Sequence, residues 1–196
     1  MADNDNELRE RLELIERMIA SGRRQTESWG WTFLVWGIAF YVAIALRHVT
    51  HSGWAWPATM ISAGFITFLV ATRVKRSQPG TAMGRMICSI WIGLGISMFL
   101  LFMSMSFNHL LYERVFVAVV CAMLGMANAI SGITLKWKMQ TACAIVWWSA
   151  SVAACFVNQY QSFFIFLAAI FFCQIVFGIY AVIRDAKRRN SGDINA

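Results

Sequence analysis

The sequence predicts an all-α polytopic membrane protein: six transmembrane helices in three antiparallel hairpins, preceded by one amphipathic helix. Three observations indicate this fold: the composition, a series of long apolar stretches, and the sorting of basic residues between their ends. Of the 196 residues, 59% are hydrophobic and 14% are charged, which is too apolar for an ordinary soluble domain of this size. The formal charge of +7 comes from residues that flank the apolar stretches, so we expect contacts with membrane lipids and not with nucleic acid.

The predicted helix at the N-terminus covers residues 5–21. Its apolar residues recur at spacings typical of one helix face, and we expect Asn4 to cap its start and Gly22 to stop it. The residues of this face are Leu8, Leu12, Ile15 and Ile19.

The polar face of this helix mixes acids and bases. Glu7 with Arg11, and Glu13 with Arg17, are spaced for ion pairs along the helix. A mixed face disfavours simple adsorption on anionic lipid. The apolar face therefore indicates contact with a partner helix, from another copy or from another membrane or cytoplasmic protein. Folding back onto the bundle's own inner face is the alternative.

Six apolar stretches follow, and none contains Asp, Glu, Lys, Arg or His in its interior. Each is roughly 16 to 22 residues long, about what a helix needs to cross a ~30 Å hydrocarbon core. Their short connections predict antiparallel neighbours and hence three hairpins. The predicted spans are 31–46, 57–72, 86–107, 115–135, 139–157 and 163–183.

Basic residues are sorted strongly between the two ends of these spans. Of the 17 Lys and Arg residues, all but Arg47 and Arg114 lie on the side that carries both termini. This bias predicts an inner-membrane protein with both termini in the cytoplasm. We divide the chain into a cytoplasmic helix (1–28), a six-helix transmembrane domain (29–183) and a basic, polar cytoplasmic tail (184–196). We expect the tail to be a disordered topology anchor.

Three histidines fall in or beside the two predicted outer loops. His48 and His51 are three residues apart, and His109 precedes Glu113 by four, so each pair could share a helix face. Three imidazoles and a carboxylate are a credible ligand set for zinc or copper on the periplasmic side. Plain interfacial polarity is the alternative, and no other cofactor is expected.

Asn128 and Gln174 are the strongest polar groups within the spans. Such side chains usually pair across a helix interface. The functional alternative is that they line a path for an uncharged solute.

The cysteines are expected to be reduced packing residues, because they lie within the spans without CxxC spacing: Cys88, Cys121, Cys143, Cys155 and Cys173.

Sequence motifs for catalysis are missing from the chain. It has no Gly-rich phosphate loop, HExxH, CxxCH or paired intramembrane carboxylates, so we do not expect an enzyme. The leading hypothesis is a scaffold, sensor or regulatory subunit that acts through helix packing and its N-terminal helix. A small channel or carrier for an uncharged or hydrophobic solute is the rival.

A set of short motifs carries a resemblance to known proteins. The motifs are Ile-Glu-Arg-Met-Ile at 15–19, Gly30-Trp31, Trp36-Gly37, Ile130-Ser131-Gly132, Leu135-Lys136-Trp137-Lys138 and Trp147. With them, the chain resembles a family of uncharacterised six-span bacterial inner-membrane proteins. The resemblance implies a fold and a location, and it supplies no functional residues.

Overall fold

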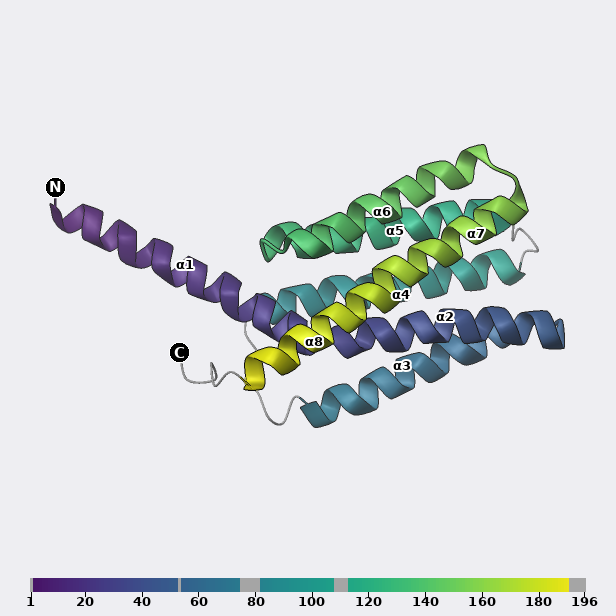
Figure 1. Ribbon diagram of the computed structural model, residues 1–196, viewed down its shortest axis with the longest axis horizontal. Coiled ribbons are helices and arrows are strands. Elements are labelled where there is room, and N and C mark those ends of the chain that lie inside the picture. The colour runs from purple at the N-terminus through teal and green to yellow at the C-terminus, as the bar shows by residue number, and fades with distance from the viewer. Residues whose placement is uncertain (1, 53, 75–81, 108–112, 191–196) are drawn as a thin grey trace.

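The computed structural model describes residues 2–52, 54–74, 82–107 and 113–190, and all regular structure among them is helical. A long first helix projects from a bundle formed by the others (Figure 1). The helices are α1 (Ala2–Ser28), α2 (Gly30–Thr50), α3 (Ala55–Val74), α4 (Ala82–Phe107), α5 (Glu113–Thr134), α6 (Lys138–Phe156), α7 (Gln159–Ile170) and α8 (Phe177–Asn190). The π-helical turn η1 (Phe171–Val176) joins α7 to α8 without a break.

Six helical segments in the described part of the chain are long and apolar enough to cross a membrane, which confirms the polytopic all-α prediction. Each predicted span coincides with one of them over most of its length, and the spans 86–107, 115–135 and 139–157 end one or two residues beyond the segment they match. Helices α2, α3 and α4 extend further than predicted, because Arg47, Arg73 and Arg85 belong to helix ends and not to loops.

The limits predicted for the N-terminal helix are wrong. Helix α1 begins before Asn4 and runs through Gly22 to Ser28, so neither residue marks an end. Gly22 serves packing instead. A Cβ atom at this position would lie 2.6 Å from Cγ of Met83 and 3.2 Å from Cδ2 of Leu135. The glycine therefore lets α1 approach α4 and the end of α5 closely.

The up-down order of the spans is as predicted, but the closest pair, α5 and α6, belongs to two different predicted hairpins. Two glycines of α5 explain the close approach. A Cβ on Gly125 would lie 2.3 Å from Cδ1 of Trp148, and a Cβ on Gly132 would lie 2.6 Å from the backbone nitrogen of Thr141. Small residues at such contacts are the usual means of packing helices in a membrane.

Small residues also join the first and last spans, since α2 packs against α8. A Cβ on Gly30 would lie 2.6 Å from Cβ of Ala181, and one on Gly178 would lie 2.8 Å from Cγ of Leu34. Helix α8 is thereby held beside the start of α2, where α1 ends. This contact places both termini of the described chain at one end of the bundle, which we call the basic end (Figure 1).

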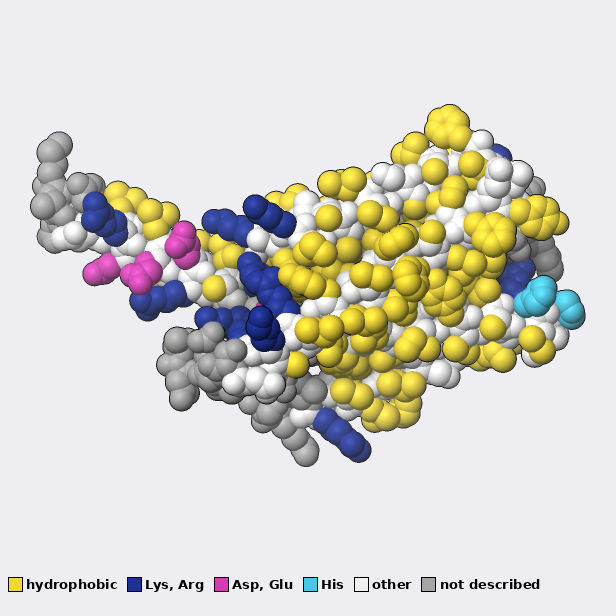
Figure 2. Space-filling view, in the orientation of Figure 1, with side chains coloured by type: hydrophobic (Ala, Val, Ile, Leu, Met, Phe, Trp, Pro, Cys, Tyr) yellow, Lys and Arg dark blue, Asp and Glu magenta, His cyan; other side chains and the backbone are white. Residues whose placement is uncertain are grey.

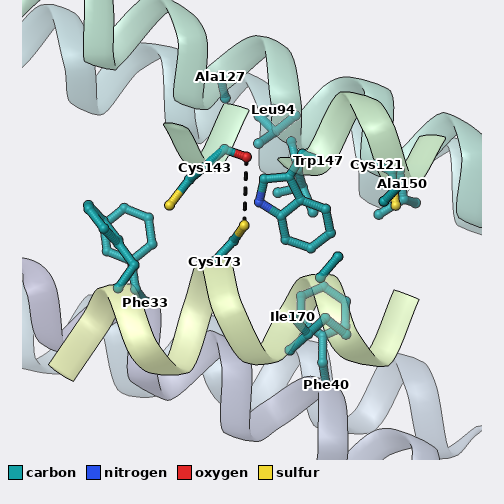
Figure 3. Packing of buried hydrophobic residues seen from close by; sticks show 14 of the residues in the cluster. Phe33, Phe40, Leu94, Cys121, Ala127, Cys143, Trp147, Ala150, Ile170 and Cys173 are labelled. Carbon is teal, nitrogen blue, oxygen red and sulfur yellow. Dashed lines mark hydrogen bonds between the residues drawn. The ribbon is translucent and has the colours of Figure 1, made fainter. Parts of the chain in front are cut away.

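The buried core is formed by residues of α2, α4, α5, α6, α7, η1 and α8 (Figure 3). Trp147 of α6 is fully buried there, beside Cys143 and Cys173. The Cys173 thiol donates a hydrogen bond to the Cys143 carbonyl oxygen at 3.6 Å, which links η1 to α6. All five cysteines are free; Cys121, Cys143 and Cys173 are buried, as expected of packing residues, whereas Cys88 and Cys155 are exposed and the packing prediction is wrong for them.

Candidate functional site at the junction of α1 and α8

The sequence predicts a disordered tail from residue 184 onward. This is wrong for its first part, because α8 continues as a helix to Asn190. The apolar stretch ends at Ile183, but Arg184 and Arg188 lie one turn apart on the helix and both reach α1. A contact with a distant acid therefore orders residues that look like a solvated tail. Residues 191–196, the rest of the predicted tail, lie outside the described residues.

Glu27, in the last turn of α1, is the acid that these arginines meet. Its side chain is only 2% exposed. Nη1 of Arg188 donates to Oε2 of Glu27 at 2.5 Å. Oε1 accepts from Nε of Arg23 at 3.2 Å and lies 3.4 Å from Nε of Arg184. The buried Glu27 carboxylate thus links Arg23, on its own helix, to Arg184 and Arg188 of α8.

The charges of this junction do not balance. Three guanidinium groups surround the Glu27 carboxylate, and a second acid, Asp185, accepts from Arg188 at 2.9 Å. The arginines stay between 25% and 39% exposed, so water still reaches them. Pairing satisfies the buried carboxylate, as burial of a charge requires, and leaves a positive surface. Basic side chains gather visibly where α1 meets the bundle (Figure 2).

Beyond this junction, the N-terminal part of α1 projects away from the bundle (Figure 1). Three of the four residues predicted to contact a partner, Leu8, Leu12 and Ile15, are 52–59% exposed. The fourth, Ile19, is half-buried and lines a pocket at the basic end. The predicted apolar face is thus divided between an exposed part and a part that packs on the bundle.

Asn128 and Gln174 are both buried inside the bundle, at 1% and 3% exposure. Asn128 donates to the carbonyl oxygen of Leu124 in its own helix, while its Oδ1 has no hydrogen-bond partner in the described structure. Oε1 of Gln174 also has no hydrogen-bond partner among the described residues. Neither residue lines a pocket at the basic end or beside the α5–α6 turn.

The predicted metal ligands are described only in part. The His48 and His51 rings lie at the end of the bundle away from α1, with centroids 6.4 Å apart (Figure 2). His109 and the side chain of Glu113 lie outside the described residues. Within the described residues, no group of three or more His, Cys, Asp and Glu could hold a metal ion. The four-residue metal site stays a prediction.

Sequence reasoning missed three residues. Gln140 is fully buried in α6, and neither the oxygen nor the nitrogen of its side-chain amide has a hydrogen-bond partner among the described residues. Glu27 follows Arg23 by four residues, a spacing that could have indicated their pair. Lys136 has a left-handed backbone, with φ 49°, and no spacing in the sequence signals it.

Comparisons of the chain with protein-family models, curated proteins and solved structures found no match. The resemblance to six-span inner-membrane proteins therefore stays a prediction.

Proposed function

We propose that this protein is a non-enzymatic scaffold, sensor or regulatory subunit that assembles with copies of itself through the projecting part of α1. The observation that carries the proposal is the exposed apolar face formed by Leu8, Leu12 and Ile15, on a helix whose base is held by Glu27. A rigid base directs this face away from the bundle. An exposed apolar face of this kind is typical of a surface that a partner covers.

The spacing along α1 supports a second copy as the partner. Leu8, Leu12, Ile15 and Ile19 follow the alternating three- and four-residue spacing of a coiled-coil seam. In a parallel pair, that register places Arg11 opposite Glu16 of the second copy, an attractive contact between flanking positions. Copies in one membrane share an orientation, so their α1 helices leave the membrane on the same side and in parallel.

We place the protein in a bacterial inner membrane with α1 and the end of α8 in the cytoplasm. The sorting of Lys and Arg to the ends that meet α1 supports this orientation. Assembly would then occur on the cytoplasmic side, where α1 could also contact other proteins.

The test is the oligomeric mass of the full chain in detergent and in nanodiscs. Replacing Leu12 and Ile15 by Asp is expected to weaken self-association at least about a hundredfold, because two apolar side chains are lost from the seam. Light scattering should then report a monomer. A wild-type chain that is already monomeric in both media would overturn the proposal.

Leu14 supplies a matched control. Its side chain is 59% exposed, as is that of Leu12, but it lies on the opposite side of the helix. Leu14→Asp is expected to leave the mass unchanged. If Leu14→Asp disrupts the assembly as strongly as the Leu12 and Ile15 changes do, the contact does not use the proposed seam.

A second candidate is a channel or carrier for an uncharged solute. It is supported by the unpartnered oxygen atoms of Asn128 and Gln174 inside the bundle, since buried polar atoms without a partner are costly and rare. A hydroxylated solute or a water molecule in transit would satisfy them.

Flux of glycerol into proteoliposomes tests this candidate. Changing both Asn128 and Gln174 to Leu is expected to lower the flux about tenfold or more, because the path loses its hydrogen-bonding groups. Flux equal to that of empty liposomes for the wild-type chain would eliminate the candidate. Ser89→Ala, on the exposed surface of α4, serves as the control and should transport normally.

A further inference from the structure

We propose that the basic end carries a binding site for an anionic phosphate ester, in the pocket between α1, the α5–α6 turn and α8. The proposal concerns a site separate from the exposed face of α1 and does not depend on self-assembly. It rests on the shape and charge of the pocket, on the arrangement of its arginines, and on the backbone of Lys136.

The pocket has a volume of about 610 Å³. This is within the range usual for small-molecule sites, roughly 300 to 1,000 Å³. It is lined by residues of three segments that are distant in the sequence, so it exists only in the folded bundle. The basic residues of its lining are Arg23, Arg24, Lys136, Arg184, Lys187 and Arg188.

The charge of the pocket favours an anion. Against these six basic residues stand two acids of the lining, Glu16 and Glu27, and Asp185 beside Arg188, so the group keeps a formal charge of +3. Glu27 is buried and already paired with arginines. A concave surface of one charge sign concentrates the electrostatic field and attracts ligands of the opposite sign.

Glu27 also orients the donors. By contacting Arg23, Arg184 and Arg188 it brings the guanidinium groups of two helices to one wall of the pocket. Part of their donor capacity is used within the junction, since Arg184 also donates to the Tyr180 hydroxyl, and Arg188 to Asp185 and to the Arg24 carbonyl oxygen. Each guanidinium has five N–H donors in a planar fork that matches the oxygen atoms of a phosphate. The carboxylate thus acts as a positioning group for an anion site.

The backbone conformation at Lys136 supports an anion site independently of the arginines. Helix α5 ends in a Schellman motif, in which the Trp137 N–H donates to the Gly132 oxygen at 2.7 Å and the Lys136 N–H donates to the Ile133 oxygen at 3.1 Å. The motif requires a left-handed backbone at position 136, where glycine is the favoured residue. Lysine is disfavoured there by its backbone, yet it places a cationic side chain in the lining of the pocket.

Two sources could supply the phosphate: the headgroup of an anionic lipid or a phosphorylated solute. The lining also contains apolar groups of Ile19, Ala20 and Leu135, which suit the glycerol region of a lipid. Basic pockets at the end of a helical bundle are known sites for anionic headgroups. The experiment therefore has one arm for each source.

The test uses the full chain in phosphatidylcholine nanodiscs. In one arm, pyrophosphate is titrated in solution and binding is read from the melting temperature. In the other arm, phosphatidylglycerol is added to the nanodisc, and native mass spectrometry counts the lipid molecules retained. We expect retention or a rise in melting temperature in at least one arm, weakening with added salt. A response to lipid alone assigns a headgroup site, and a response to pyrophosphate assigns a solute site.

Lys136→Gly separates binding from folding. Glycine removes the charge and relieves the left-handed backbone, so the ligand-free variant is expected to melt at a higher temperature. Its affinity for the responding ligand should fall about fivefold, the effect of losing one basic residue at a membrane surface.

Lys138→Gly is the matched control, because it removes an equal charge two residues away and outside this pocket. It should bind as the wild type does. No response in either arm, or equal losses for Lys136→Gly and Lys138→Gly, would overturn the proposal.

Discussion

Replacing Glu27 by glutamine is expected to lower the free energy of unfolding by about 2 kcal/mol and to release α1 from α8. The side chain is 2% exposed and contacts Arg23, Arg184 and Arg188. Glutamine has nearly the same shape, so the change removes the charge with little loss of packing. The arginines remain partly exposed and can be hydrated, which keeps the expected loss below the roughly 3 to 5 kcal/mol of a fully buried broken pair.

Two measurements check this expectation. Unfolding in mixed detergent micelles reports the loss of stability. Trypsin cleavage after Arg24 reports the release of α1, because cleavage within a helix requires local opening. Cleavage after Arg11 should keep its rate, since that part of α1 projects from the bundle in either case.

Glu13→Gln is the control for charge removal on the same helix. Glu13 pairs with Arg17 at 2.5 Å, but both side chains are more than 60% exposed. An exposed pair of this spacing contributes less than about 0.5 kcal/mol. Equal stability losses for the Glu13 and Glu27 variants would contradict the anchoring role assigned to Glu27.

Gly132→Ala is expected to destabilise the bundle by about 1 to 3 kcal/mol, although alanine is the better helix former. The added Cβ would lie 2.6 Å from the backbone nitrogen of Thr141 and 3.1 Å from the carbonyl carbon of Gln140. Backbone atoms of a packed helix cannot move aside as a flexible side chain can. Helices α5 and α6 would have to separate, and they are the most closely packed pair in the fold.

Gly95→Ala is expected to change the stability of the bundle in the opposite direction, again measured by the denaturant midpoint. No atom lies within 4 Å of a Cβ at this position, so alanine should raise stability by about 0.5 to 1 kcal/mol through its helix propensity. The denaturant midpoints of the two variants should therefore shift in opposite directions. A Gly132 variant as stable as the Gly95 variant would show that α5 and α6 do not approach as closely as described.

The positions of the spans could be predicted because charged side chains are costly in hydrocarbon. Each uncharged run between Trp31 and Ile183 corresponds to a helix long enough to cross a membrane. The helix ends could not be predicted as well. Arg47 and Arg85 extend beyond the apolar core and remain helical, and Gly22 does not end α1 because its small size serves a contact with Met83.

Part of the candidate site was also predictable. The spacing of Leu8, Leu12, Ile15 and Ile19 indicates one face of a helix whatever the rest of the chain does, because helical periodicity is a local property. The same spacing does not reveal that Ile19 lies on the bundle while Leu12 remains exposed. That division depends on the direction in which α1 leaves the membrane.

Membrane insertion and the apolar face of α1 thus follow from the sequence alone, since both arise from hydrophobicity repeated at short range. The junction at Glu27 and the pocket near Lys136 arise only in the folded bundle. Glu27 and Arg188 are 161 residues apart, and they meet because Gly30 and Gly178 allow α2 and α8 to pack closely. Long-range pairing of charges depends on this packing of small residues, which neither composition nor periodicity encodes.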